Sequence, residues 1–225
     1  MNEIGTFDIL GPNMIGPSSS HTAGALRIAF IAGSMVEKAV SVKFELYGSF
    51  ARTYHGHGTD RALVGGILGY QPDDERIRDS FDHAKEAGLE FEFIENFEEK
   101  DVYPNTVDIY VKDANGAEVT LRGESIGGGN AVITKLNGVD VELTGNYNTL
   151  VVEQVDQKGV LAFLTMVLST NDINIGTVRL FREGKGKKAT TIIEVDSKIP
   201  DRVINALYGY DAVKNVIVVP RIKMD

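Results

Sequence analysis

Residues 150–169 read LVVEQVDQKGVLAFLTMVLS, and this stretch decides the fold of the C-terminal part of the chain. Residues 150–154 form a short apolar run that suits a strand, and residues 158–169 carry apolar side chains at the spacing of a buried helix. The polar residues between the two runs predict a tight connection. The stretch therefore predicts a strand that leads directly into a helix.

The same order of elements continues through the rest of the tail. The later elements that we expect are strands at 173–181 and 189–195, a helix at 200–208 and a strand at 213–219. The order βαββαβ is that of the ferredoxin-like split motif, in which two helices cover one face of an antiparallel sheet.

This element order resembles the ACT domain, a small ligand-sensing module found in many enzymes of amino-acid metabolism. The resemblance also rests on Asp156, Gln157, Lys158 and Gly159, which lie between the first strand and the first helix of the tail. It implies that these four residues bind a regulatory amino acid. A purely structural domain is the alternative, because many unrelated functions share the fold.

The first part of the chain has the pattern of a mixed α and β domain. A buried helix is expected over residues 23–39. Thr59 is placed to cap a second helix that runs to about Gly69, and Asp73 to cap a third that ends at Gly88.

Strands are expected between and after these helices along the sequence. They cover residues 42–46, 89–94, 106–112, 118–122, 132–136 and 139–143. The dipeptides Asn115-Gly116 and Asn137-Gly138 predict tight hairpins, because their residues tolerate positive φ. The polar, turn-rich residues 145–148 predict a boundary, which gives an α+β protein with domains at 1–147 and 148–225.

Composition and charge exclude several classes of partner. The chain has 43% hydrophobic residues, as an ordinary globular protein does. It carries 23 basic and 32 acidic residues, a net charge of -9, with no concentration of lysine or arginine. We therefore expect no nucleic acid and no membrane as a partner. Without a basic leader segment or a run of 18 apolar residues, the protein is expected to be cytoplasmic.

The chain contains no cysteine. This excludes disulfides, a thiol nucleophile and any cysteine-ligated zinc or iron-sulfur site supplied by this chain. We expect no metal ligand among its residues.

Residues 16–24, GPSSSHTAG, stand at the start of the first expected helix. The first turn of a helix leaves amide donors unpaired and carries positive potential, so a hydroxyl there both caps the helix and helps to hold an anion. One hydroxyl is enough for capping, whereas the motif has four, on Ser18, Ser19, Ser20 and Thr22. With the titratable His21, the motif indicates a site for a carboxylate or phosphate; simple capping is the alternative.

Residues 54–62, YHGHGTDRA, form a second polar cluster. His55 and His57 are separated by one glycine and precede Thr59 and Asp60 at another expected helix start. A histidine held near Thr59 and Asp60 suits a general base. The pattern lacks a clear third ligand for zinc, and a glycine-rich loop with exposed histidines is the alternative.

Residues 124–130, ESIGGGN, form the third cluster. Three glycines allow the backbone to approach a ligand closely and to offer amide donors. The spacing is not that of a nucleotide-binding loop.

The three motifs in this order, followed by the ACT-like tail, resemble the beta chain of the bacterial iron-sulfur-dependent L-serine dehydratase over essentially the whole sequence. The resemblance implies a lyase subunit that removes water from L-serine to give pyruvate and ammonia. It also implies an alpha chain whose cysteines hold a 4Fe-4S cluster, the iron acting as a Lewis acid. The first domain would then resemble the allosteric substrate-binding domain of some D-3-phosphoglycerate dehydrogenases.

The resemblance also implies roles for residues of the three motifs. His57 is the expected base for the α-proton, although His55 departs from the family pattern and leaves the choice between the two open. Asp60 is expected to orient His57 or to bind the substrate ammonium, and His21 completes the catalytic set. The expected substrate contacts are Ser18, Ser19, Ser20, Thr22, Thr59, Gly127, Gly128, Gly129 and Asn130.

The tail has two expected roles under this resemblance. It senses serine or a monovalent cation such as potassium, or it pairs two copies into a homodimer within the heteromer. Two other functions stay open from the sequence. One is a non-catalytic amino-acid-binding regulatory module, and the other is a structural chain that only steadies an alpha subunit.

Overall fold

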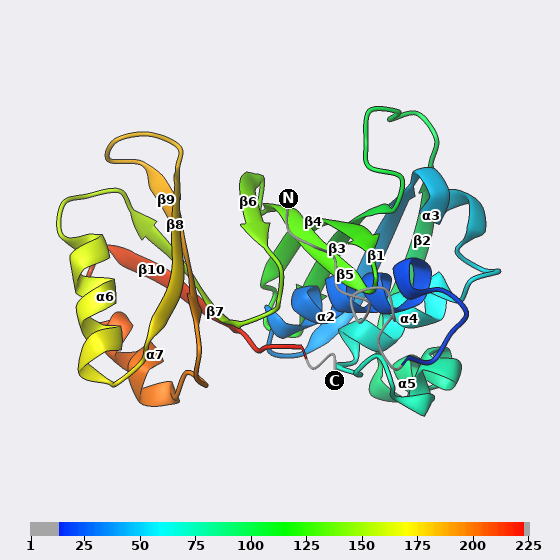
Figure 1. Ribbon diagram of the computed structural model, residues 1–225, viewed down its shortest axis with the longest axis horizontal. Helices are drawn as coiled ribbons and strands as arrows, with labels where there is room; N and C mark the ends of the chain where they lie inside the picture. Colours follow the sequence, from blue (N-terminus) through cyan, green and yellow to red (C-terminus); the bar gives the residue numbers. More distant parts are fainter. Residues whose placement is uncertain (1–13, 223–225) are drawn as a thin grey trace, which may run out of the picture. The chain divides into compact units, whose positions relative to one another are not determined.

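The computed structural model describes residues 14–222, which divide into two units (Figure 1). The described part of unit 1 is residues 14–144 with Ile222, and unit 2 is Gly145–Arg221. The division lies shortly before the predicted boundary at 147. Each unit has its own sheet and helices, so the predicted α+β class is confirmed. In this described range, no helix combines the length and the apolar character needed to cross a membrane.

Unit 1 is built on a six-stranded sheet with the order β2-β1-β3-β4-β5-β6. Its strands are β1 (Ala39–Tyr47), β2 (Glu90–Asn96), β3 (Thr106–Asp113), β4 (Glu118–Gly127), β5 (Asn130–Leu136) and β6 (Val139–Leu143). β1 and β2 are parallel, and the other neighbours are antiparallel. Both Asn-Gly hairpins are confirmed; Asn137 and Gly138 have φ of 48° and 80°, as such a turn requires.

Helices cover one face of this sheet (Figure 1). They are the π-helix η1 (Ser19–Gly24), α2 (Ala25–Ser34), α3 (Gly48–Thr53), α4 (Thr59–Ile67), the 3-10 helix η2 (Glu75–Asp79) and α5 (Ser80–Ala87). α2 packs on β3, β4 and β5, and α4 packs on α2. The two helices approach so closely that a methyl group at Gly66 would lie 2.4 Å from the Leu26 carbonyl oxygen.

Three details of the expected helices are corrected by the structure. The helix expected over residues 23–39 is continuous with a π-helical turn before it and ends at Ser34, since β1 already begins at Ala39. Asp74, rather than Asp73, caps the following turn by accepting a hydrogen bond from the Arg76 amide. Gly58, rather than Thr59, occupies the N-cap of α4, because the chain there adopts a positive φ of 68° that favours glycine.

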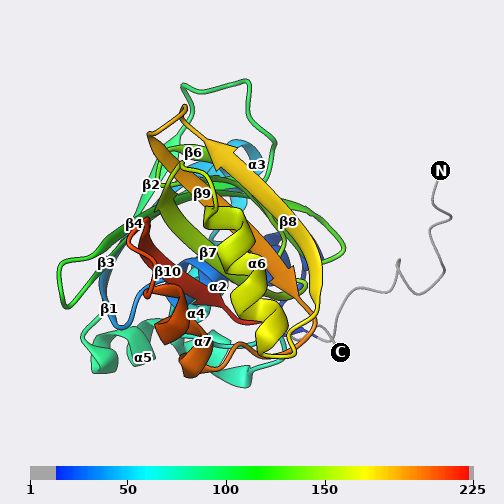
Figure 2. The ribbon, with the colours of Figure 1, turned by 90° about the vertical axis from the view of Figure 1, so that its left-hand side faces the viewer.

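Unit 2 has a four-stranded antiparallel sheet with the order β10-β7-β9-β8. Its elements are β7 (Asn148–Val155), α6 (Val160–Thr170), β8 (Ile175–Arg182), β9 (Lys188–Val195), α7 (Asp201–Leu207) and β10 (Val213–Val219). The sequence of strands and helices is the predicted βαββαβ. Figure 2 shows α6 and α7 on the same side of the sheet. The core of the unit is one apolar cluster in which Leu150, Leu164, Ile193 and Val203 are fully buried.

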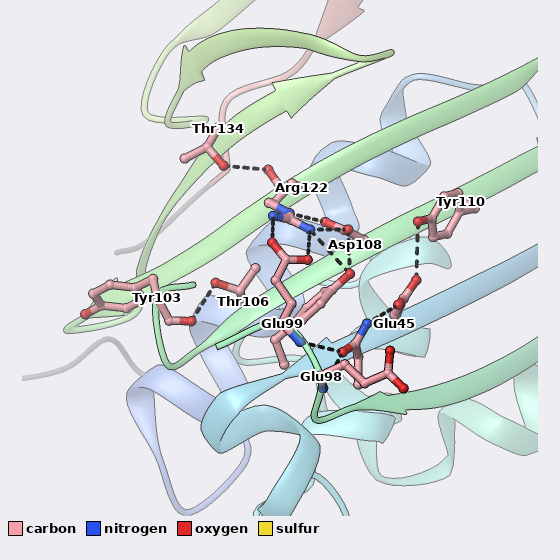
Figure 3. A network of polar contacts seen from close by, with 11 residues as sticks. Glu45, Glu98, Glu99, Tyr103, Thr106, Asp108, Tyr110, Arg122 and Thr134 are labelled. Carbon is pink, nitrogen blue, oxygen red and sulfur yellow. Dashed lines mark hydrogen bonds and ion pairs between the residues drawn. The ribbon is translucent and has the colours of Figure 1, made fainter. Parts of the chain in front are cut away.

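A polar network lies on the sheet of unit 1 and holds the connection between β2 and β3 (Figure 3). Arg122 on β4 donates two hydrogen bonds of 2.7 Å to the two oxygens of Asp108 on β3. Its two terminal nitrogens, Nη1 and the shared Nη2, donate to the Glu99 carboxylate of the connection at 2.8 and 3.2 Å. Tyr47 donates a further bond to Asp108, and burial together with this bond raises the pKa of the tyrosine, so the donor keeps its proton.

The network predicts unequal costs for removing its two carboxylates. Asp108→Ala leaves the largely buried Arg122 without its main partner and is expected to destabilise the chain by about 3–5 kcal/mol. Glu99→Gln removes a partner whose side chain is 44% exposed, and is expected to cost about 1 kcal/mol or less. Urea unfolding of the two variants measures the difference. Equal losses would contradict this ranking.

Candidate active site

The motif at residues 16–24 forms a π-helical turn that continues into α2. Ser18 is its N-cap, and the Ser18 hydroxyl accepts a hydrogen bond of 3.2 Å from the His21 amide. No described residue hydrogen-bonds the hydroxyls of Ser19 and Ser20. One hydroxyl therefore meets the capping need, and two remain available to a ligand. Single π-helical turns are rare and occur frequently at functional sites.

The His21 ring is half-buried and lies among groups from three segments. Its Nε2 is 3.0 Å from the Ser49 hydroxyl at the start of α3, and its Nδ1 is 3.3 Å from the Ser18 hydroxyl. The His57 ring lies 4.7 Å from it between centroids. Burial, and then the neighbouring His57, lower the pKa of His21. His21 is therefore predominantly neutral near pH 7 and can both donate and accept a hydrogen bond.

His57 lies in the short connection between α3 and α4 and is fixed through its backbone. Thr22 donates a hydrogen bond of 3.1 Å from its hydroxyl to the His57 carbonyl oxygen. The ring Nδ1 is buried and has no partner among the described residues, and the same holds for the hydroxyl of the fully buried Thr59. Such atoms are costly and therefore uncommon in folded proteins. The unpartnered Nδ1 belongs to the ring that lies beside His21, which indicates a place prepared for a ligand.

His55 and Asp60 form a separate pair. The Nδ1 of His55 is 2.8 Å from an Asp60 carboxylate oxygen, and the His55 side chain is 72% exposed. The other Asp60 oxygen accepts a hydrogen bond from the Arg61 amide. The expectation that Asp60 orients His57 is therefore wrong, because Asp60 orients His55. Of the two histidines left open by the sequence, His57 is the one that contacts the first motif.

The third motif is a β-hairpin rather than an open loop. Residues 124–127 complete β4, Gly128 and Gly129 make the turn, and Asn130 begins β5. Gly127, Gly128 and Gly129 have φ of 99°, 60° and 78°, which explains the three glycines by turn geometry.

Ser125 connects this hairpin to the first motif. Its hydroxyl donates a hydrogen bond of 2.8 Å to the Ser20 carbonyl oxygen. Gly24 lies directly over it, so a Cβ there would be 2.0 Å from the Ser125 hydroxyl. The sequence places Ser125 within the third motif but does not indicate its role. Nothing in the sequence indicates Ser49, because α3 is too short to show a helical period.

The residues expected to bind a regulatory ligand form the connection between β7 and α6 in unit 2. The Asp156 carboxylate lies 3.2 Å from the Arg182 guanidinium. Gly159 has a φ of 89° at the N-cap of α6, and Gln157 and Lys158 are exposed. The glycine therefore has a structural reason, and the aspartate already has a cationic partner.

Comparison with known proteins assigns the chain to a family. A family model described as serine dehydratase beta chain matches residues 6–137, which is more than half of the chain. The chain belongs to the serine dehydratase beta chain family.

Full-length relatives agree with this membership. The chain is 41% identical over 212 residues to the L-serine dehydratase beta chain of Peptoniphilus asaccharolyticus, covering 94% of this chain and 96% of that one. It is 42% identical over 218 residues to a probable L-serine dehydratase beta chain of Bacillus subtilis, covering 96% of each. It is also 33% identical over 161 residues to an L-serine dehydratase of Streptomyces coelicolor, covering 61% of this chain and 35% of that protein.

The contact between Gly24 and Ser125 generates a prediction about stability. Gly24→Ala introduces a methyl group into space that Ser125 occupies, and overpacking of this kind is expected to cost about 1–3 kcal/mol. In a Ser125→Gly background the same substitution is expected to cost less, because the obstructing side chain is gone. Thermal unfolding of the four proteins of this double-mutant cycle measures the coupling. Strictly additive losses would show that the two residues do not meet.

Proposed function

We propose that the chain is the beta subunit of an L-serine dehydratase and supplies proton-handling and anion-holding groups to its active site. Family membership supports the enzyme class. The observation that carries the proposal is the meeting of the His21 and His57 rings, whose centroids are 4.7 Å apart, together with the buried His57 Nδ1 that lacks a described partner. This arrangement suits a polar ligand that completes the site.

The substrate carboxylate suits the π-helical turn. The hydroxyls of Ser19 and Ser20 have no described partner, and the start of a helix carries positive potential from its unpaired amides. The neutral His21 adds a donor to the same turn. We propose that this turn binds the carboxylate and thereby places the α-carbon near His57.

His57 is the proposed base. It removes the α-proton of L-serine, and the hydroxyl group leaves from the β-carbon as water, which gives aminoacrylate. Aminoacrylate tautomerises to the imine, and water hydrolyses the imine to pyruvate and ammonia. Positioned acid–base groups of this kind contribute about 10²–10⁴ in rate.

The residues of this chain do not fit an iron-sulfur cluster. The chain has no cysteine, and the described residues contain no group of three histidine, aspartate or glutamate side chains placed to hold a metal ion. We therefore propose that a 4Fe-4S cluster of the enzyme is held by an alpha chain. Two points support a second chain in the enzyme. Two relatives are named beta chains, and this chain covers only 35% of the L-serine dehydratase of Streptomyces coelicolor.

Unit 2 is proposed to be an ACT domain that pairs two copies of the chain. Its element order and strand order support this assignment. β8 lies at one end of the sheet, and the apolar side chains of Val178 and Leu180 on it are 36% and 41% exposed. An exposed apolar edge strand is suited to pairing with another strand. Sensing of serine or potassium by this domain stays a prediction.

The proposal predicts different effects for the two neighbouring histidines. In a complex reconstituted anaerobically with the alpha chain, His57→Asn is expected to lower kcat by about 10²–10⁴-fold. His55→Asn is the matched control, since His55 is exposed and pairs with Asp60 outside the contact with the first motif. It is expected to leave kcat nearly unchanged. Pyruvate formation measures both, and size-exclusion chromatography checks that both variants assemble.

Full activity of His57→Asn would remove His57 from the mechanism. A wild-type complex that binds L-serine without forming pyruvate would instead support an amino-acid-binding regulatory module.

A further inference from the structure

Asn105 precedes β3 and carries a buried side-chain oxygen, Oδ1, that no described residue hydrogen-bonds. Thr106 pairs with Glu124, and the Ser125 amide donates a hydrogen bond of 3.0 Å to the Asn105 carbonyl oxygen. Asn105 therefore stands opposite Ser125. Residues opposite each other on antiparallel strands present their side chains on the same face. Asn105 thus belongs to the face on which Ser125 bonds to Ser20 of the π-helical turn.

A second contact places Asn105 beside the other half of the site. The carbonyl oxygen of Pro104, one residue earlier, accepts a hydrogen bond of 2.6 Å from the Ser49 amide. The hydroxyl of the same Ser49 lies 3.0 Å from His21 Nε2. Asn105 is therefore flanked by the two serines that contact the first motif, Ser49 and Ser125.

The segment that carries Asn105 is fixed without help from the Asn105 side chain. Arg122 holds Glu99, and the Thr106 hydroxyl donates a hydrogen bond of 2.7 Å to the Tyr103 carbonyl oxygen (Figure 3). Backbone bonds from Ser49 and Ser125 fix Pro104 and Asn105 themselves. A buried acceptor that supports no contact of its own segment opposes folding, so its presence calls for a ligand.

We propose that Asn105 is a substrate-binding residue whose Oδ1 accepts a hydrogen bond from the ammonium group of the amino-acid substrate. This inference rests on the proposed function. The ammonium group brings three donors and no acceptor, so it needs acceptors from the site. Asp60 is already bonded to His55 and Arg61, whereas Oδ1 of Asn105 has no described donor.

The proposed contact also gives the site a means of rejecting substrates that lack an amino group. A buried acceptor left without its donor penalises an analogue far more than an apolar pocket can. Asn105 would thus select α-amino acids over the corresponding acids with no donor group on the α-carbon, without taking part in proton transfer.

The test uses the complex reconstituted with the alpha chain and compares two ligands. One is L-serine as substrate, and the other is 3-hydroxypropanoate, which is serine without its amino group, as a competitive inhibitor. Asn105→Leu is expected to lower kcat/KM for L-serine by on the order of 10²-fold, because a hydrogen bond to a charged group is lost. The inhibition constant of 3-hydroxypropanoate is expected to stay the same or to fall.

Thr106→Val is the matched control. Thr106 is the next residue along the strand, is fully buried, and its hydroxyl donates its hydrogen bond within its own segment, to Tyr103. Its replacement is expected to lower the unfolding temperature of the free chain and to leave kcat/KM unchanged. Asn105→Leu is expected to lower kcat/KM and to have an unfolding temperature no lower than that of the wild type. Asn105→Asp keeps acceptor oxygens and is expected to retain most of the activity that Asn105→Leu loses.

Three results would overturn the inference. The first is an unchanged kcat/KM for L-serine in Asn105→Leu, and the second is a parallel loss of affinity for both ligands. The third applies if Asn105→Leu fails to fold: Asn105→Asp then loses kcat/KM by the roughly 10²-fold expected for Asn105→Leu. In each case a wild-type complex that forms pyruvate leaves the proposed function standing. A wild-type complex that forms none would reject the proposed function itself.

Discussion

The structure of unit 1 depends on the seating of the π-helical turn, Ser19–Gly24, on the β4–β5 hairpin. Ser125 bonds to the Ser20 carbonyl oxygen, and only a residue without Cβ at position 24 permits the approach. This contact joins segments about a hundred residues apart in the chain, as the hydrogen bond from Ser125 to Ser20 shows. With the turn fixed there, Thr22 can hold the backbone of His57 and His21 can face its ring.

The same arrangement leaves several buried polar atoms without described partners. They include His57 Nδ1, the Thr59 hydroxyl and Asn105 Oδ1, all in unit 1. Each opposes folding, and strong bonding elsewhere in unit 1, such as the network of Arg122, Asp108 and Glu99, can offset the cost. A site that is incomplete in the free chain is what a subunit requires when another chain supplies the rest. The unpartnered atoms thus lower the stability of the free chain at the place where a ligand is expected.

The sequence could predict the elements whose signals are local, but not the contacts between distant segments. Periodicity and Asn-Gly dipeptides located most strands, both hairpins and the βαββαβ order, because these patterns follow directly from backbone geometry. The six-residue α3 escaped, since it is shorter than two helical turns. Motifs singled out His21 and His57, whereas Ser49 and Asn105 gave no signal, as their importance arises only from the register of strands and the position of a loop. The partner of Asp60 likewise depended on side-chain direction, which spacing does not determine.

The most direct test of this account is the pKa of His21, measured by NMR titration of the free chain, in which only four histidines need to be assigned. The account predicts a value below the ordinary 6.5, and a rise toward 6.5 in His57→Asn because a neighbouring charge is removed. In His55→Asn the value should not move, since His55 lies outside the contact. A His21 pKa at its ordinary value that does not respond to His57→Asn would contradict the claim that the two motifs share one site.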